Sequence, residues 1–208
     1  VLVACALVFA SCSDSYMEDM NTDPSKAAVI DPNAQLTTVQ LQTYGDLEMV
    51  ETLRSYVYAF TQQLMGCWNT TNYGGRHTLD LNEMGHIWQR YYLTGVKNIT
   101  DAQVRTEGDA TKVNINAVVR IYRVYLMSLL TDLYGDVPYF EAGKGFTDGK
   151  FTPKYDTQEE IYSDFFVELD AAVVALDASK DRITGDVIYK GDVSKWKKLA
   201  NSLRLRYA

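Results

Sequence analysis

The sequence predicts an all-α protein made of antiparallel helix pairs joined by long loops. Several long segments repeat apolar residues at steps of three and four, which is the period of a helix with one buried face. Stretches rich in Gly, Asn and Thr, which favour turns and loops, separate these segments. Two helix start signals, Asp31-Pro32 and Thr157-x-x-Glu160, each place a capping side chain before an apolar run.

The central element is a long apolar helix that ends at a stop signal. Gly135 can close a helix in a left-handed conformation, and Pro138 cannot continue one and drives Val137 toward extended geometry. A second row of residues at the helical period widens the predicted buried face. The main row is Val113, Ala117, Val118, Ile121, Tyr122, Tyr125, Leu129, Leu130 and Leu133, and the second row is Asn116, Arg120, Arg123 and Met127.

Two predicted helices precede the central one. The first runs from Asp31 to about Gly66, Gly45 could interrupt it, and we expect it to pack on the central helix through one apolar face. That face consists of Leu47, Val50, Leu53, Val57, Phe60 and Leu64. Residues 66–84 lose all periodicity and are predicted to form a loop. A second helix begins near Glu83, includes Ile87, Trp88, Tyr91, Tyr92, Leu93, Val96 and Ile99, and ends before Gly108.

Two more predicted helices follow a loop at residues 143–154. The first begins at the Thr157-x-x-Glu160 capping box and buries Ile161, Phe165, Leu169, Ala172, Val173 and Leu176. After a polar turn around Asp181 and Gly185, the last helix runs from about Val193 to the end of the sequence. We expect Trp196, Leu199, Ala200, Leu203 and Tyr207 to point inward, and Lys195, Lys197, Lys198, Arg204 and Arg206 to face solvent or another subunit.

Composition excludes some functional classes. The 208 residues are 47% hydrophobic, which is incompatible with a disordered chain and sufficient for one domain with a real core. The net charge of −7 lacks the basic footprint of a nucleic-acid-binding protein, and no polybasic membrane patch is present. Fifteen Tyr and three Trp residues can serve either as core aromatics or as stacking platforms for flat apolar faces such as those of sugars.

The N-terminus has the features of an exported lipoprotein. Residues 1–11 form an apolar run that is too short to span a bilayer, and we interpret it as part of a signal peptide. Phe9-Ala10-Ser11-Cys12 resembles a lipobox, so Cys12 is the predicted lipidation site and residues 12–30 the tether. The acidic stretch after Cys12 resembles a signal for export to the cell surface. If Cys5 leaves with the signal peptide, Cys67 has no disulfide partner, and we expect it to be a small buried residue.

Two blocks carry a resemblance to a known family. Asp132–Ala142, DLYGDVPYFEA, and Asp186–Ala208, DVIYKGDVSKWKKLANSLRLRYA, occur in the order of the signatures of SusD/RagB-type nutrient-binding lipoproteins of Bacteroidetes. This resemblance implies helix pairs of tetratricopeptide-like type and a TonB-dependent, SusC-like transporter as partner in the outer membrane. A strict 34-residue repeat is not evident. Members of this family are more than twice as long, so the resemblance also implies that residues 31–208 are the N-terminal helical part of a truncated SusD-like domain.

Catalytic and metal-binding motifs are not found in the sequence. The two histidines, His77 and His86, form no HExxH pair, and no G-x-S-x-G elbow, phosphate-binding loop or EF-hand is present. Two of the three acidic residues Asp132, Asp136 and Glu141 could be imagined as the carboxylate pair of a glycosidase. Their place in the stop signal favours capping and turn roles instead. We therefore predict no enzyme activity, no metal and no cofactor.

The loop between the first two helices is the predicted ligand-binding site. Aromatic rings stack on sugar C–H faces, and amide and guanidinium groups hydrogen-bond to hydroxyls. The resemblance to starch-binding members carries this role to Trp68, Asn69, Tyr73 and Arg76, and Asn72 and His77 lie in the same loop. In the alternative interpretation, Trp68 and Tyr73 pack the loop onto the protein body.

The predicted function is a surface lipoprotein that captures a nutrient, expected to be a glycan, for the transporter. The alternative is a mainly structural module that docks the transporter, with a peptide or another nutrient bound by the missing C-terminal half.

Overall fold

The structure is a computed structural model that describes residues 17, 20, 30–44, 47–64, 72–78 and 80–208. The chain divides into residues 1–30, of which Met17, Met20 and Ile30 are described, and a helical unit at residues 31–208. The predicted signal peptide, Cys12, most of the predicted tether, Cys67, Trp68 and Asn69 lie outside the described residues.

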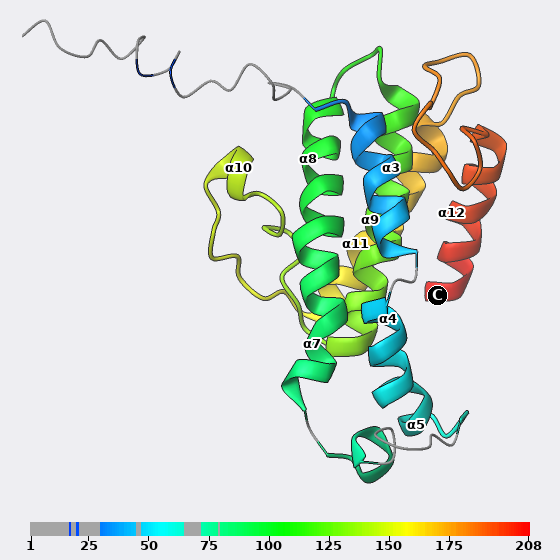
Figure 1. Cartoon of the computed structure of the whole chain (residues 1–208). Helices are drawn as coiled ribbons and strands as arrows, with labels where there is room; N and C mark the ends of the chain where they lie inside the picture. The colour runs from blue at the N-terminus through cyan, green and yellow to red at the C-terminus, as the bar shows by residue number, and fades with distance from the viewer. Residues whose placement is uncertain (1–16, 18–19, 21–29, 45–46, 65–71, 79) are drawn as a thin grey trace, which may run out of the picture. The chain divides into compact units, whose positions relative to one another are not determined.

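The predicted all-α class is confirmed, because the described residues form helices and no strand longer than an isolated bridge (Figure 1). Among the described residues, the helices before the central one are α3 (Pro32–Thr43), α4 (Leu47–Thr52), α5 (Tyr58–Phe60), α7 (Leu81–Arg90) and α8 (Lys97–Thr106). Two π-helical segments, η2 (Leu53–Val57) and η4 (Tyr91–Val96), join α4 to α5 and α7 to α8, and η3 (Gly74–Arg76) is a 3-10 turn. The central helix is α9 (Val113–Tyr134), followed by α10 (Gly145–Asp148), α11 (Gln158–Ala175) and α12 (Val193–Tyr207).

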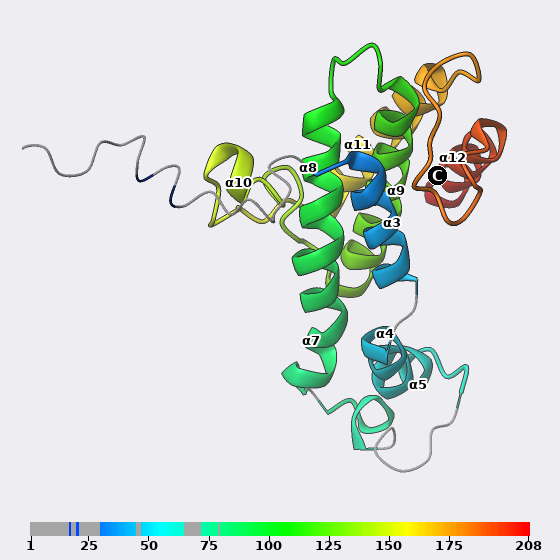
Figure 2. The same ribbon diagram turned by 45° about the horizontal axis from the view of Figure 1, so that its top comes forward.

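Helix α9 is the centre of the bundle, as predicted. It packs against α8, α11, α3 and α12, and Figures 1 and 2 show it enclosed by these helices. Val118, Ile121, Leu126 and Leu130 are completely buried. At this position a helix must be apolar on most of its surface, which explains why two rows of the sequence follow the same period.

The stop signal after α9 lies at the predicted glycine, although Gly135, with a ψ of −124°, is outside the left-handed helical conformation that was predicted. Gly135 has a φ of 75°, a value that an L side chain rarely adopts, and its N–H donates to the Thr131 carbonyl at 2.8 Å. Val137 is extended and exchanges two backbone hydrogen bonds with Asp156, at 3.2 and 3.1 Å. The chain therefore turns back onto the start of α11, where the predicted capping box of Thr157 and Glu160 is present.

The N-terminus of α9 is capped from another part of the chain. Its own N-cap residue, Lys112, forms no side-chain cap. The carboxylate of Asp181 instead accepts hydrogen bonds from the N–H groups of Asn114, at 2.7 Å, and Ile115, at 3.0 Å. The polar turn predicted around Asp181 thus satisfies two of the free N–H groups of α9, the longest of the described helices.

The predicted helix at residues 31–66 is interrupted between Thr43 and Leu47, in agreement with the expected break near Gly45, and its second segment ends at Phe60. The predicted packing on the central helix holds for α3, which packs on α8 and α9, but is wrong for α4, which packs mainly on α7. The predicted apolar face is also not the buried one: Leu47, Val50, Phe60 and Leu64 are exposed, whereas Thr52, Ser55 and Tyr56 are buried. Periodicity assigned the wrong face because the break after Thr43 reorients the second segment.

The other predicted elements match with small shifts. Helix α7 begins at Leu81, with Asp80 as the N-cap that accepts from the N–H groups of Asn82 and Glu83. Gly108 follows α8 with a φ of 73°. The loop at residues 143–154 contains the short helix α10, which was not predicted, and Leu93, in the middle of the second predicted helix, is exposed. Among the described residues, no helix is both long and apolar enough to cross a membrane.

Candidate functional site

The described part of the predicted binding loop is held tightly against η2. A Cβ atom at Gly74 would lie 2.6 Å from the Ser55 carbonyl oxygen, so only glycine allows this close approach. The Tyr56 hydroxyl donates to the Thr78 carbonyl at 3.0 Å and accepts from the Asp80 N–H at 2.7 Å. Residues 72–78 are therefore fastened to η2, and Tyr56 also contacts Asp80, the N-cap of α7.

The described side chains of the predicted binding site differ in exposure. Tyr73 is half-buried and its ring lies over Tyr56, with centroids 6.1 Å apart and planes 29° apart. Asn72, Arg76 and His77 are exposed. Hydrogen-bonding groups thus stand beside an aromatic ring, which suits a hydroxylated ligand with apolar faces. The contact of Tyr73 with Tyr56 is also what the packing interpretation requires.

His77 makes another aromatic contact between this loop and the segment before it. Its ring lies 4.9 Å from that of Phe60, and its backbone is left-handed, with a φ of 55°. The His77 ring thus lies beside Phe60, the last residue of α5.

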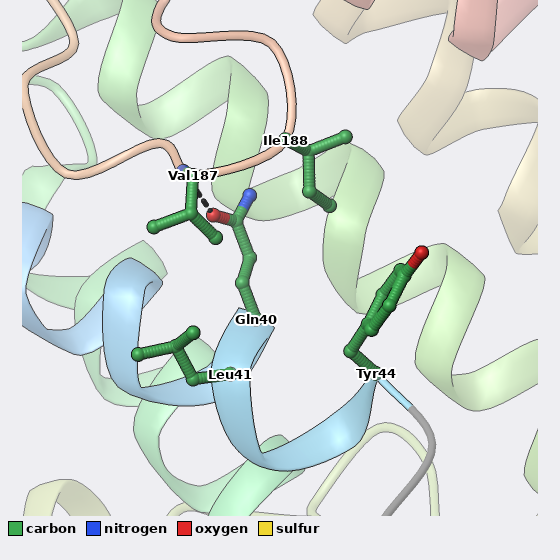
Figure 3. Close-up of a pocket in the computed structure, with 5 residues that line it drawn as sticks. All are labelled: Gln40, Leu41, Tyr44, Val187 and Ile188. Carbon is green, nitrogen blue, oxygen red and sulfur yellow. Dashed lines mark hydrogen bonds between the residues drawn. The ribbon is translucent and has the colours of Figure 1, made fainter.

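A groove of about 420 Å³ lies at the C-terminal end of α3 (Figure 3). Figure 3 shows Leu41 on α3, Tyr44 at the C-cap of α3 and, across the groove, Val187 and Ile188 on the loop that precedes α12. Tyr44 is 83% and Leu41 65% exposed. The groove is an apolar surface that sequence reasoning did not identify.

A buried carboxylate, Asp186, directly precedes the two loop residues, Val187 and Ile188, that line this groove. It is 5% exposed and accepts hydrogen bonds from Trp196 Nε1 at 2.7 Å, Gln40 Nε2 at 3.0 Å and the Gly191 N–H at 2.9 Å. The N–H of Ile188 donates to it at 2.9 Å. Burial alone would raise the pKa of Asp186, but these hydrogen bonds outweigh it and the pKa lies below its usual value.

The loop that carries Asp186 is fastened directly to α3. The side-chain oxygen of Gln40 accepts from the Val187 N–H at 2.8 Å, which is the dashed line in Figure 3. The Thr37 hydroxyl donates to the Gly185 carbonyl at 2.6 Å, and a Cβ atom at Gly185 would lie only 1.9 Å from the Asn33 carbonyl oxygen. The Asp186-to-Trp196 part of the second block is thus a device that attaches the last helix to α3.

The acidic residues of the first block have turn and capping roles, in agreement with the prediction. Asp136 accepts from the Gln158 N–H at 2.9 Å, and Glu141 accepts from the Lys154 N–H at 3.1 Å. Asp132 accepts from the Tyr162 hydroxyl. The partners of these three carboxylates lie in α11 and in the connection that precedes it.

The side chain of Asp156 holds this turn together through several hydrogen bonds. Its role was not identified from the sequence. It is buried and accepts from the N–H groups of Tyr139, at 3.0 Å, and Phe140, at 2.9 Å, and it pairs with Lys154 at 3.1 Å. Burial acts to raise the pKa of Asp156, but the hydrogen bonds and the Lys154 ammonium lower it below its usual value. A signal was present, because Asp156 directly precedes the capping box.

A group of aromatic side chains lies beside the same turn. Trp88 contacts Tyr92, Tyr134 and Tyr155, with ring centroids 4.7, 5.2 and 6.2 Å away. The Tyr92 hydroxyl donates to the Pro138 carbonyl at 2.7 Å. Tyr155 is 64% exposed, so the cluster reaches the surface, whereas its other members fasten α7 and η4 to the end of α9.

A smaller, polar pocket of about 220 Å³ lies among α8, α9, α11 and the connection that follows α9. Arg123 and Phe140 contribute to its lining. No group of three or more His, Cys, Asp or Glu side chains that could hold a metal occurs in the part of the chain that the structure describes.

Comparison with known proteins identifies similar chains. A family model described as "Starch-binding associating with outer membrane" (SusD-like) matches residues 24–208. A solved structure titled "Bacteroidetes AC2a SusD-like" is 49% identical, with a TM-score of 0.77, and the match covers 86% of this chain and 33% of that one. A chitin-binding protein is 41% identical, with a TM-score of 0.79, and the match covers 85% of this chain and 38% of that one.

A third similar structure is a SusD homolog from Parabacteroides distasonis, with 29% identity and a TM-score of 0.71. That match covers 86% of this chain and 35% of the homolog. The chain thus spans about a third of the length of the solved structures that it matches. Among curated proteins, none matches the sequence.

Proposed function

Because the chain belongs to the SusD-like family, we propose that it is the N-terminal helical part of a surface-exposed lipoprotein that binds a glycan nutrient. The protein would deliver this ligand to a TonB-dependent, SusC-like transporter in the outer membrane and would not convert it chemically. The observation that carries the proposal is the family match over residues 24–208, combined with 49% identity to a SusD-like structure.

The loop between α5 and α7 supports a role in ligand binding. Arg76, Asn72 and His77 present hydrogen-bonding groups to solvent, and Tyr73 holds an aromatic ring next to them. Trp68 and Asn69 precede them in the same loop and complete the proposed binding set. A glycan offers both the hydroxyls and the apolar ring faces that these groups recognise.

The anchoring part of the proposal rests on the N-terminal sequence. Cys12 follows an apolar run and small residues, and we propose that it carries the lipid that holds the protein to the outer membrane. The family description, which names association with the outer membrane, supports this location.

The transporter and the anchor can be tested in one experiment. The tagged protein, expressed from its complete reading frame, would be purified from outer membranes, and mass spectrometry would identify co-purified proteins and the N-terminal peptide. We expect a TonB-dependent transporter and an acylated Cys12. A soluble, unacylated protein without a barrel partner would overturn this part of the proposal.

The ligand can be tested by titrating the purified protein with malto-oligosaccharides and chito-oligosaccharides. These two probes follow from the starch-binding family description and the chitin-binding relative. We expect binding to at least one of them, weakened by Arg76→Ala but not by Arg182→Ala, a change of another exposed arginine outside the loop. Silence of the protein across a complete glycan array would overturn the glycan version.

A second candidate function is a helical module that mainly docks the transporter. The observation that favours it is that the match covers only 33–38% of the two most identical structures reported above. In this version the ligand, a peptide or another nutrient, is bound by a part of the protein outside residues 1–208. It predicts that Trp68→Ala leaves ligand affinity unchanged while the transporter complex still forms.

A further inference from the structure

The polar pocket of about 220 Å³ lies apart from the loop that carries Arg76. Its walls come from three helices, with Thr100 on α8, Arg123 on α9 and Asp164 on α11. Phe140 and Lys144, in the connection after α9, complete the lining on one side. The volume is slightly below the usual range of small-molecule pockets, about 300–1,000 Å³, so it suits a ligand of one small ring.

The wall of the pocket contains a buried cation without a counter-ion. Arg123 is only 6% exposed, and among the described residues it forms no ion pair. Its Nη2 donates to the Tyr139 carbonyl at 2.9 Å, its guanidinium lies 4.3 Å from the centre of the Tyr139 ring, and its Nε has no hydrogen-bond partner. Buried charges in proteins are ordinarily paired, so this guanidinium attracts an anion.

The neighbouring arginine of α9, in contrast to Arg123, is paired with a carboxylate. Arg120, one helical turn earlier on α9, binds Glu168 with two hydrogen bonds, at 2.7 and 3.0 Å. Both oxygens of Glu168 are therefore occupied, and this carboxylate does not serve Arg123. Lys144 is a second cation of the lining, and it also lacks an ion pair within the described part of the chain.

The other lining groups suit the hydroxyls and the ring of a sugar. One oxygen of Asp164 accepts from the Tyr139 hydroxyl at 2.6 Å, and the other accepts no hydrogen bond from the described residues. Glu107 stands exposed at the rim, and the hydroxyl of Thr100 is buried without a partner. Phe140, 38% exposed, offers an apolar face. Carboxylates accept hydrogen bonds from sugar hydroxyls, and an aromatic side chain contacts sugar C–H groups.

We propose that this pocket binds one acidic sugar residue, a uronate. Its carboxylate would pair with Arg123 and Lys144, its hydroxyls would donate to Asp164 and Glu107, and its ring would lie against Phe140. The inference deepens the proposed function, because it names an acidic glycan as a ligand class, but it uses none of the residues of the α5–α7 loop.

The test is a titration of the purified protein with glucuronate, glucose and glucosamine, followed by NMR or calorimetry. These sugars share a ring, and where glucose has neutral hydroxyl groups, glucuronate carries a carboxylate at C6 and glucosamine an ammonium at C2. We expect glucuronate to bind about tenfold or more tightly than glucose, and glucosamine to bind no better than glucose, because a hydrogen-bonded charge pair is worth about that factor. Equal binding of glucuronate and glucose, or no binding of glucuronate, would overturn the inference.

Matched lysine variants locate the site. Lys144→Gln should weaken glucuronate binding about tenfold, whereas Lys180→Gln, which changes an exposed lysine outside the pocket, should leave it unchanged. Arg123→Gln should abolish the preference for glucuronate over glucose. The helical circular dichroism of this variant is compared with that of the unchanged protein to establish that the variant is folded. An unchanged preference in both Lys144→Gln and folded Arg123→Gln would overturn the inference.

Failure of the uronate inference can be distinguished from failure of the proposed function. Arg76→Ala should leave glucuronate affinity unchanged, and a loss there would place the sugar in the loop and contradict the pocket assignment. If neutral oligosaccharides bind and glucuronate does not, the uronate inference fails while the proposed function stands.

Discussion

The indole N–H of Trp196 donates a hydrogen bond of 2.7 Å to the buried carboxylate of Asp186. The same carboxylate accepts from Gln40 on α3, 146 residues away in the sequence. Asp186 thus links the first described helix, the loop beside the groove of Figure 3 and the last helix. Because it replaces water for several donors at once, its removal leaves each of them unsatisfied.

Replacing Asp186 by Asn should therefore destabilise the protein strongly. The variant keeps the shape but loses the charge and places an NH₂ group against N–H donors, so we expect a loss of about 2–4 kcal/mol in the free energy of unfolding. Urea denaturation followed by circular dichroism measures it. Asp170→Asn is the matched control, since Asp170 is exposed and pairs with Arg204 at the surface, and it should stay within about 0.5 kcal/mol. Similar losses in the two variants would contradict the role of Asp186.

The same carboxylates should make stability depend on pH. The pKa values of Asp186 and Asp156 are below the usual value of 3.8, so the folded state binds protons less readily than the unfolded chain. Their contribution is complete above the unfolded pKa and is lost as the pH falls through 3.8 and on toward the folded pKa. We expect the urea midpoint to fall between pH 6 and pH 3, by less in Asp186→Asn than in the unchanged protein. An equal fall in both proteins would show that Asp186 is not one of the groups responsible.

Two glycine substitutions should have opposite effects. Gly185→Ala places a Cβ atom 1.9 Å from the Asn33 carbonyl oxygen, so the loop must move away from α3, at a cost of more than about 2 kcal/mol. Gly85→Ala, inside α7, meets nothing closer than 4.0 Å and should stabilise the helix by about 0.5–1 kcal/mol. Thermal denaturation of the two variants checks the signs. A stable Gly185→Ala protein would mean that the loop is not fastened to α3.

The cap on α9 gives a further prediction. Asp181→Ala removes the acceptor for the Asn114 and Ile115 N–H groups, and we expect a loss of about 1–2 kcal/mol in urea denaturation. Glu159→Ala, at an exposed position in the first turn of α11, serves as the control and should have a smaller effect. If the two changes were equal, the capping assignment would be wrong.

The two interpretations of the binding loop can be separated by one pair of variants. Tyr73→Ala removes a ring that packs on Tyr56 and should lower the melting temperature, whereas Arg76→Ala changes an exposed side chain and should not. If the loop binds a glycan, both variants weaken binding in a titration with the oligosaccharide that the unchanged protein recognises. Loss of stability in Tyr73→Ala with unchanged affinity in both variants would favour the packing interpretation.

Local signals in the sequence were sufficient for much of the fold. The start and stop of a helix depend on a few adjacent residues, so the capping box at Thr157 and the glycine at position 135 could be identified without tertiary information. The central position of α9 also followed from the sequence, because only a helix enclosed by others is apolar on most of its surface.

Contacts between distant residues were decided only by the tertiary structure. The buried face of residues 47–60 depends on how the chain turns after Thr43, which periodicity does not encode, and the exposure of Leu47 and Val50 shows the result. The roles of Asp186, Asp181 and Arg123 depend on partners or on a pocket formed by other helices. A side chain's type in the sequence fixes which interactions it can make, but packing determines which partner it meets and whether its charge remains unpaired.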